Sequence, residues 1–437
     1  MSSPAAIRNF GPGQLTLTVR NPFLYKFPFR DPPPETQIMI GISKLYCGTV
    51  EPSDALRYGR QSERLPSHLL QFSKDKKPVV VWNTGRRCNL RCKHCYTGSG
   101  NQRGNNELNR AEGLALIDDL AGYGVPVILF SGGEPLLRPD LLELITHARR
   151  RGIRAVLSTN GTLITRDMAA RLQDAGVAYV GISLDGIGAT HDRFRGVPGA
   201  FSRALKGIRH CLEADLKVGL RLTISRRNAR EIDAVFDLIA GEGIPRVCFY
   251  HLVYAGRGSR LVAEDLPRPR SRQAVELIMN RTRALHEAGN RVEVLTVDNH
   301  CDGPAVYLRL VRERNERAGR VLDLLKMNGG NGSGRGIGCI SWDGTVHPDQ
   351  FWRHLNLGNV RETPFSRLWT EDAPPWLLRL RERKKYLKGR CATCRWLDIC
   401  NGNLRTRAEA VHGDIWAPDP ACYLTDAEID PQGDLGP

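Results

Sequence analysis

The feature that most constrains the fold of this chain is a repeated alternation of apolar strands and amphipathic helices between residues 79 and 260. The predicted strands are Val79–Trp82, Val127–Phe130, Ala155–Ser158, Tyr179–Ser183, Gly219–Ile224 and Val247–Leu252. Strands joined by helical crossovers form a parallel sheet. Because a closed barrel requires eight such units, six units predict an α/β fold with an open, partial (β/α)6 TIM-type barrel. Its ligand site is expected at the C-terminal ends of the strands.

The rest of the chain is divided by composition. A Pro-rich stretch precedes Met39, helical patterns cover Arg270–Gly289 and Ala305–Met327, and a glycine-rich stretch covers Asn328–Gly338. The expected parts are a flexible N-terminal extension (1–38), an N-terminal segment (39–78), the barrel (79–270), linking helices (271–334) and a small C-terminal domain (335–437).

Composition and charge limit the class of protein and its partners. No run of about 18 apolar residues is present, which predicts no membrane span. The 63 Lys and Arg against 47 Asp and Glu give a net charge of +16. No nucleic-acid-binding pattern accompanies this charge, and a polyanionic small substrate or a general bias toward arginine explains it equally well. Clustering of many of the 12 cysteines predicts metal ligation in a reducing, cytoplasmic compartment.

Three cysteines, Cys88, Cys92 and Cys95, follow the first predicted strand with Cys-x3-Cys-x2-Cys spacing. A loop this tight can place three thiolates on three corners of an iron–sulfur cube and leave the fourth iron free to hold a small molecule. Zinc is the alternative, with His94 as a fourth ligand, although zinc sites favour paired cysteines.

Polar motifs end the next three strands. Gly132 and Gly133 would let a ligand approach the backbone closely, and the carboxylate of Glu134 can accept a hydrogen bond from an ammonium group. The other candidate cofactor contacts are Ser158, Asn160, Ser183, Asp185 and Arg195. Arginine matches the geometry of a carboxylate ligand. An alternative interpretation is that Asn160 and Asp185 cap the helices that follow them.

A second set of cysteines lies near the C-terminus. Cys391, Cys394 and Cys400 have Cys-x2-Cys-x5-Cys spacing, and Cys422 follows after 21 residues. Paired cysteines admit zinc as well as an iron–sulfur cluster.

Together these motifs resemble those of the radical S-adenosylmethionine (SAM) enzymes. The resemblance implies that the first three cysteines hold a [4Fe–4S] cluster whose free iron binds SAM. It also implies that the Gly132-Gly133-Glu134-Pro135 element cradles the methionyl amine, and that Ser183 and Arg195 hold the methionyl carboxylate.

The C-terminal cysteines resemble the SPASM or twitch-like extension of the same enzymes, in which these four positions hold an auxiliary [4Fe–4S] cluster. Asp349 and Leu404 stand where full SPASM domains have further cysteines. The resemblance therefore implies two clusters in all and gives no role to Cys339. Because four thiolates leave no open iron, we expect the auxiliary cluster to transfer electrons.

From Met39 to Tyr96 the sequence resembles the 12,18-didecarboxysiroheme deacetylases, radical SAM enzymes of siroheme-dependent haem biosynthesis. This resemblance implies an iron-containing tetrapyrrole substrate that loses two acetate side chains to give Fe-coproporphyrin III. It also implies a low-potential electron donor such as ferredoxin or flavodoxin. Related enzymes that remove propionates in the denitrification haem pathway, or decarboxylate Fe-coproporphyrin to haem, share the cluster motifs and stay as alternatives.

Substrate contacts are the least constrained part of the prediction. His300 follows a strand-like run, where a neutral imidazole can ligate haem iron or supply a proton. Tyr254 is the second catalytic candidate. The remaining options are His251, His347, His354, Arg257 and Arg260. For any one histidine, a core or surface role is the alternative.

Two other classes of protein are weighed against this hypothesis. A peptide-modifying SPASM maturase is disfavoured because residues 1–78 do not resemble a winged helix. A zinc-scaffolded nucleic-acid binder agrees with the basic charge, but it has no use for the polar motifs at the strand ends.

Overall fold

The computed structural model describes residues 39–49 and 77–432. An 11-stranded sheet runs through them in the order β1-β8-β7-β6-β5-β4-β3-β2-β9-β10-β11. Its parallel centre consists of β2 (Val79–Asn83), β3 (Val127–Ser131), β4 (Arg154–Thr159), β5 (Tyr179–Ser183), β6 (Val218–Ile224), β7 (Arg246–His251) and β8 (Glu293–Val297). The first six are the predicted strands, and the sheet does not close, so the open barrel is confirmed.

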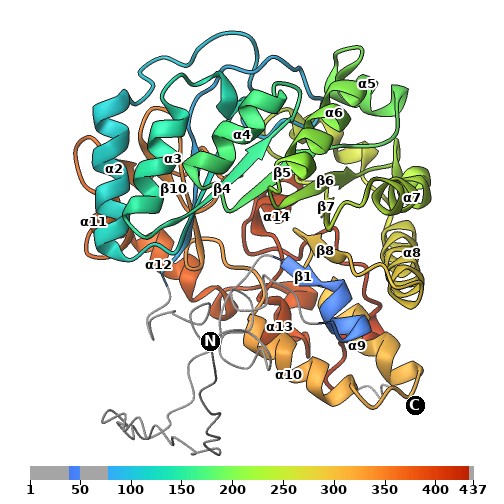
Figure 1. Cartoon of the computed structure of the whole chain (residues 1–437). Coiled ribbons are helices and arrows are strands. Elements are labelled where there is room, and N and C mark those ends of the chain that lie inside the picture. Colours follow the sequence, from blue (N-terminus) through green and yellow to red (C-terminus); the bar gives the residue numbers. More distant parts are fainter. Residues whose placement is uncertain (1–38, 50–76, 433–437) are drawn as a thin grey trace, which may run out of the picture. The chain divides into compact units, whose positions relative to one another are not determined.

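Helices connect the parallel strands and cover the sheet (Figure 1). They are α2 (Arg110–Tyr123), α3 (Leu141–Arg150), α4 (Arg166–Ala175), α6 (Ala200–Glu213), α7 (Ile232–Glu242) and α8 (Arg268–Glu287). In α3 the buried residues are Leu141, Leu144, Ile145 and Ala148, which form one apolar stripe at helical spacing. Burial of such stripes against the apolar strands fixes the ends of the strands, and with them the loops that carry the polar motifs.

The region expected to hold linking helices also contributes a strand to the barrel sheet. β8 pairs in parallel with β7, and β1 (Met39–Gly41) pairs antiparallel with β8. The single helical stretch expected over residues 305–327 is two helices, α9 (Asp302–Arg312) and α10 (Ala318–Asn328). Arg314 lies between them with a left-handed φ of 51°, which ends the first helix.

The C-terminal part of the chain continues the same sheet. β9 (Ile337–Ile340) pairs in parallel with β2, which sets Cys339 opposite Val81. Two short antiparallel strands, β10 and β11, complete this edge at Thr345–His347 and Gly358–Asn359. The helices that follow are α11 (Phe365–Trp369), α12 (Pro375–Arg381), α13 (Leu397–Cys400), α14 (Arg405–His412) and α15 (Asp426–Ile429). The expected boundary near residue 334 is therefore not a break in the sheet.

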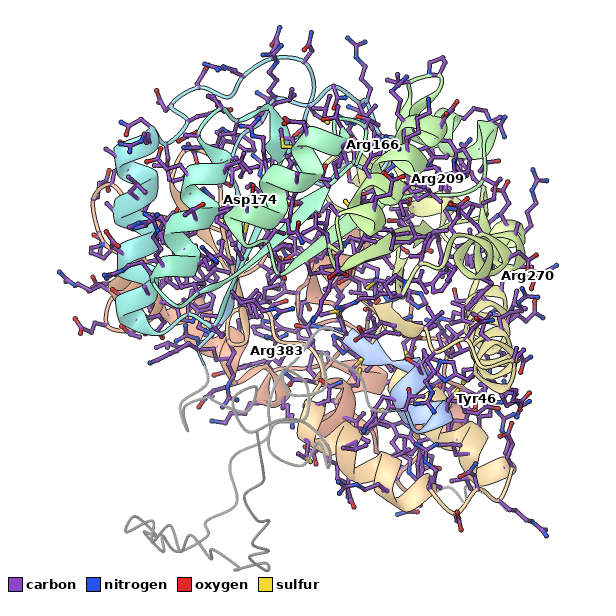
Figure 2. The ribbon with its side chains drawn as sticks, viewed as in Figure 1. Tyr46, Arg166, Asp174, Arg209, Arg270 and Arg383 are labelled. Atoms are coloured by element: carbon purple, nitrogen blue, oxygen red, sulfur yellow. The ribbon has the colours of Figure 1, made fainter. Side chains whose placement is uncertain are left out.

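The N-terminal segment is anchored where the structure describes it. The Tyr46 hydroxyl, in the helical turn Ser43–Cys47, donates a hydrogen bond to the Glu313 carboxylate at 2.8 Å (Figure 2). The predicted extension 1–38 and residues 50–76 of the predicted N-terminal segment lie outside the described residues. Among the described helices, none combines the length and the apolar character needed to cross a bilayer.

Candidate active site and iron–sulfur sites

The first three cysteines lie in the loop that leaves β2. Cys88 and Cys92 are buried, and Cys95 is half-buried. Each sulfur has a polar neighbour: the Leu90 amide is 3.4 Å from Cys88 Sγ, the Arg195 guanidinium is 3.4 Å from Cys92 Sγ, and the Thr97 hydroxyl is 3.1 Å from Cys95 Sγ. Hydrogen bonds to thiolate sulfurs are among the protein's means of tuning an iron–sulfur centre.

Burial makes these thiols poor acids when no metal is bound. Desolvation, followed by the nearby Glu134 carboxylate, raises the pKa of Cys88 to about 12, and burial also raises the pKa of Cys92. Iron binding can offset this cost because a metal ligand is bound as the thiolate. Within residues 39–49 and 77–432 no three such side chains converge on one ion-sized position. A cube of iron and sulfide places its thiolates further apart than the ligands of a single ion. Three thiols on one loop, each beside a polar group, are a donor set of the kind that holds an iron–sulfur cluster.

The two motif glycines pack directly against the cysteine loop. The Gly133 amide donates to the Gly85 carbonyl, and the Glu134 amide donates to the Arg87 carbonyl, both at 2.8 Å. A β-carbon added to Gly133 would lie 2.1 Å from the Arg87 oxygen, and Gly132 has a φ of 124°. The glycines are required here by the contact between two backbone segments, which sets the position of the cysteine loop.

The Glu134 side chain joins the ends of β3 and β4. It is buried and accepts hydrogen bonds from the Thr159 hydroxyl at 2.6 Å and the Asn160 amide at 2.8 Å. Burial raises the pKa of Glu134, whereas these hydrogen bonds oppose that rise. Asn160 in turn donates to the Asn89 side chain at 2.8 Å. This network fixes the cysteine loop to the end of β4.

Asp185 and Arg195 form a buried ion pair beside Cys92. Arg195 ends α5 (Ala189–Arg195), and its guanidinium is 2.5 Å from Asp185, whose side chain is 0% exposed. Burial opposes ionisation of Asp185, but Arg195 and the other contacts of the carboxylate hold its pKa below the ordinary value. The pair therefore presents a guanidinium to the cysteine loop.

The alternative interpretation as helix caps is wrong for both residues to which it was applied. The helix after β4 is capped by Thr165, and the helix after β5 is preceded by Gly188. Of the remaining candidate contacts, Ser158 accepts a hydrogen bond from Arg221, and Ser183 lies half-buried at the end of β5. The candidate cofactor contacts thus lie near one another at the C-terminal ends of the strands.

The four C-terminal cysteines also come together. Burial raises the pKa of Cys400 far above its ordinary value, and the thiols of Cys422, Cys391 and Cys394 raise it further by proximity. A fifth cysteine joins them: contact with the Cys301 thiol lowers the pKa of Cys422 to about 7. Cys301 is fully buried after β8. The local spacing of the sequence gives no signal for this neighbour, because the chain brings it in from another element.

Asp349 and Leu404, which stand where full SPASM domains have further cysteines, make contacts of a different kind. Buried Asp349 accepts hydrogen bonds from the Ser333 hydroxyl at 2.5 Å and the Phe351 amide at 2.8 Å. Arg383, also buried, donates to the Ser333 carbonyl (Figure 2). Leu404 packs with the apolar residues after β7. Asp349 is thus held by hydrogen bonds, and Leu404 is held by apolar contacts.

The two predicted catalytic residues differ in placement. His300 is 1% exposed, and neither ring nitrogen has a hydrogen-bond partner in the described residues. Burial lowers its pKa to about 3, so the imidazole is neutral. His300 lines neither of the two hollows near the cysteine loop. Tyr254 lines the second hollow, although its hydroxyl donates to Asp265 at 2.6 Å.

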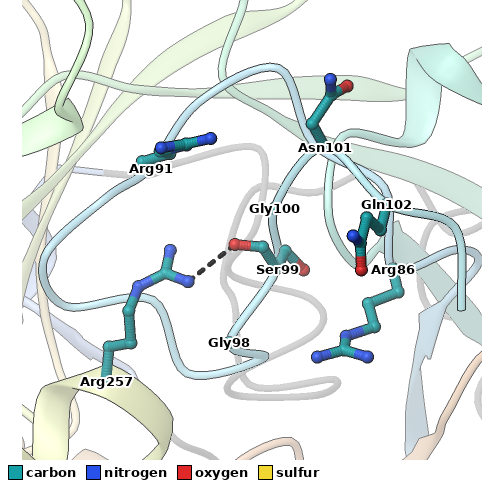
Figure 3. A pocket seen from close by; sticks show the side chains of 8 residues that line it. All are labelled: Arg86, Arg91, Gly98, Ser99, Gly100, Asn101, Gln102 and Arg257. Carbon is teal, nitrogen blue, oxygen red and sulfur yellow. Dashed lines mark hydrogen bonds between the residues drawn. The ribbon is translucent and has the colours of Figure 1, made fainter.

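The first hollow, of about 540 Å³, lies beside the cysteine loop, and we call it the arginine hollow (Figure 3). Arg86, Arg91 and Arg257 surround the backbone of residues 98–102. Arg257 is fixed there, because it donates to the Cys92 carbonyl at 2.8 Å and to the Ser99 carbonyl at 2.7 Å. This hollow suits an anionic partner.

The second hollow, of about 430 Å³, is the aromatic cavity, and it lies between the cysteine loop and the C-terminal part of the chain. Three aromatic side chains line it, Tyr96, Tyr254 and Phe351, together with the polar residues Arg353, His354, Thr406 and Glu409. Sequence reasoning missed Arg353 and Glu409, because neither belongs to a motif.

An open α/β barrel with three thiols after its first strand, followed by a cysteine-rich C-terminal domain, defines a radical SAM protein with a SPASM-type extension. The family model of the radical SAM superfamily matches residues 82–239, and that of the SPASM iron–sulfur cluster-binding domain matches residues 334–395. These two domains account for a SAM-binding cluster and an auxiliary cluster.

Curated relatives indicate a narrower group within the radical SAM superfamily. The chain is 64% identical to Fe-coproporphyrin III synthase of Methanosarcina barkeri, over 90% of this chain and 99% of the relative. It is 45% identical to pre-heme d1 synthase of Dinoroseobacter shibae, over 82% of this chain and 89% of the relative. It is 34% identical to AdoMet-dependent heme synthase of M. barkeri, over 79% and 95%. The chain belongs to the radical SAM family of haem-biosynthesis enzymes.

Solved structures agree on the fold. Native anSMEcpe with bound AdoMet and Cp18Cys peptide matches with a TM-score of 0.62 at 18% identity, over 79% of this chain and 94% of that chain. Streptococcus suis SuiB bound to S-adenosylmethionine matches with a TM-score of 0.63 at 17% identity, over 80% and 78%.

Proposed function

We propose that this enzyme removes the two acetate side chains of 12,18-didecarboxysiroheme to give Fe-coproporphyrin III. The observation that carries the proposal is the 64% identity to Fe-coproporphyrin III synthase over nearly the whole of that relative. The basic charge of the chain agrees with a substrate that carries several carboxylates. We place the activity in the cytoplasm, because cysteines clustered for metal ligation suit a reducing compartment.

In this proposal Cys88, Cys92 and Cys95 hold a [4Fe–4S] cluster. With SAM bound, that centre would supply the radical chemistry needed to remove hydrogen from a saturated position of the macrocycle. The protein's own part is positional. The glycine pair and Asn160 hold the cysteine loop, and Arg195 donates to Cys92 and would bind the methionyl carboxylate of SAM.

Cys391, Cys394, Cys400 and Cys422 hold the auxiliary [4Fe–4S] cluster, whose task is to accept or relay the residual electron. Four thiolates leave that cluster without a site for substrate. The variant Cys394→Ala should abolish product formation. If deoxyadenosine formation and product yield both stayed at wild-type levels, the electron-transfer role would be wrong.

The electron donor is a low-potential protein such as a ferredoxin or flavodoxin, and the arginine hollow is its docking site. The hollow borders the cysteine loop, and Arg86 and Arg91 are exposed there. Basic side chains of this kind attract acidic partners over a range of about one Debye length.

The test is anaerobic incubation of the reconstituted protein with SAM, a reductant and didecarboxysiroheme, followed by mass spectrometry. Loss of two acetates supports the proposal. Loss of propionates would instead assign the reaction of the denitrification haem pathway, and formation of vinyl groups would assign the final decarboxylation. No mass change, under conditions in which SAM is cleaved, would refute a tetrapyrrole substrate and favour a peptide-modifying role.

A further inference from the structure

We propose that the aromatic cavity receives one face of the tetrapyrrole, and that His354 ligates the iron of this substrate through Nδ1 while Glu409 orients the imidazole. The inference rests on the proposed function, because that function supplies the iron-containing macrocycle. It adds the site, the ligand atom and the groups that hold the substrate.

The histidine and the carboxylate form an oriented pair. His354 Nε2 is 3.0 Å from Glu409 Oε1, and Trp352 Nε1 donates to the other oxygen of Glu409 at 2.6 Å. A carboxylate accepts hydrogen bonds, so a neutral imidazole in this geometry donates from Nε2 and has its lone pair on Nδ1. Histidines that ligate metals characteristically donate their other N–H to a carboxylate in this way.

The histidine is also accessible. Its side chain is 61% exposed, and it lines the aromatic cavity. The other candidate histidines are committed elsewhere. His347 uses both ring nitrogens, with Ser341 and the Leu355 carbonyl, and His251 is buried against Asp302. His300 is enclosed. Of the four candidates, His354 alone combines access to the cavity with an available ring nitrogen.

The walls of the cavity suit a flat apolar ring system. Tyr96 and Phe351 meet edge to face with ring centroids 5.7 Å apart, and Tyr254 adds a third aromatic surface. Tyr96 directly follows Cys95, so one wall belongs to the cysteine loop itself. A macrocycle against this wall would lie beside the predicted source of the radical.

The rim of the cavity offers donors for the carboxylates of the substrate. Arg353 is held by the Thr97 carbonyl at 2.7 Å and stacks over Trp342 at 4.4 Å. Its Nε has no hydrogen-bond partner in the described residues, and the buried hydroxyl of Thr406 likewise has none there. Because guanidinium groups bind carboxylates through paired N–H bonds, the Arg353 side chain that lines the cavity is the candidate partner for a propionate.

The test uses the full-length, anaerobically reconstituted protein and two probes, ferric coproporphyrin III and metal-free coproporphyrin III. Wild-type protein should shift the Soret band of the ferric probe. The variant His354→Ala should lose that shift and bind the ferric probe at least about 10-fold more weakly, the lower limit for loss of a group that merely orients a metal ligand. Glu409→Gln should weaken binding of the ferric probe about 10-fold. The metal-free probe should bind all three proteins within about twofold. The matched control is His412→Ala, an exposed histidine on the same helix as Glu409.

Restoration of the Soret shift by added imidazole in His354→Ala would further support ligation. The inference is overturned if His354→Ala keeps the shift and the affinity. It is also overturned if affinity for both probes falls together, because the histidine would then act by packing, or if wild-type protein binds neither probe. The proposed function is judged separately by acetate loss in the turnover assay with wild-type protein, so the two can fail independently.

Discussion

Substitution of Gly133 by alanine should displace the cysteine loop. The added β-carbon would lie 2.1 Å from the Arg87 carbonyl oxygen, whereas real β-carbons keep about 3.0 Å from other atoms, so the two backbones must separate by about 0.9 Å. The obstacle is backbone on both sides, and no flexible side chain can move aside. Overpacking of this kind costs about 1–3 kcal/mol of stability. A displacement of about 1 Å in reacting groups costs on the order of 100-fold in rate.

The assay measures iron content, the electron paramagnetic resonance spectrum of the reduced cluster with and without SAM, and the rate of deoxyadenosine formation. The matched control is Gly100→Ala, which lies in the same loop and has no atom within 4 Å of the added β-carbon. We expect the control to behave as wild type and the Gly133 variant to form deoxyadenosine about 100-fold more slowly. Equal rates in the two variants would refute the argument that this contact positions the loop.

Three further predictions follow from the described contacts. In the wild type the Asn160 backbone N–H donates to the Glu134 carboxylate at 2.8 Å. Glu134→Gln would replace the accepting oxygen by an NH2 group and leave this buried N–H without an acceptor. The variant should therefore lower the free energy of unfolding by about 1–3 kcal/mol, measured by thermal denaturation. Burial raises the pKa of Asp298 to about 7, so the native state keeps a proton that the unfolded chain releases near pH 4, and stability falls as the pH rises between these values. Asp298→Asn should therefore stabilise the protein by about 3 kcal/mol more at pH 8 than at pH 5, measured by thermal denaturation at both pH values. An equal change at both pH values would contradict this. Arg86→Glu with Arg91→Glu should slow reduction by flavodoxin about 10-fold at low salt and leave reduction by dithionite unchanged.

The barrel could be predicted because its strands are local apolar runs. Each strand from β2 to β7 carries its own signal, and short crossovers leave a parallel sheet as the simple arrangement. The extensions of the sheet depend on pairing across long stretches of chain. β9 joins β2 from more than 200 residues away, and β1 joins β8 from a similar separation. No local pattern specifies such partners, so these strands were not predicted as part of the sheet.

The same distinction applies to the candidate sites. Cys88, Cys92 and Cys95 are close in sequence, so their spacing alone indicates a common centre. Cys301 reaches Cys422 only through the packing of α9 against the C-terminal part of the chain. The pairing of His354 with Glu409 likewise depends on how α14 lies beside the loop after β10. Neither contact can be predicted from spacing in the sequence, because both depend on the three-dimensional fold.

The predicted SAM contacts carry a second, structural duty, and the ion pair of Arg195 with Asp185 allows the two duties to be separated. Arg195→Gln leaves the fully buried Asp185 without its guanidinium, and an unpaired buried charge costs about 3–5 kcal/mol. Arg195→Lys keeps the charge but loses the planar fork that reaches both Asp185 and Cys92. We therefore expect the Gln variant to lose iron and thermal stability, and the Lys variant to retain iron while its SAM-dependent spectral change weakens.

The double variant Asp185→Asn with Arg195→Gln serves as the control, because it removes the stranded charge. If the ion pair is structural, the double variant should recover much of the stability lost in Arg195→Gln, since no charge is then left buried. If Arg195→Gln instead kept its iron and its thermal midpoint and lost only the response to SAM, Arg195 would act on the cofactor alone. The contact with Cys92 would then be a consequence of that role, because the cysteine loop would hold its position without it.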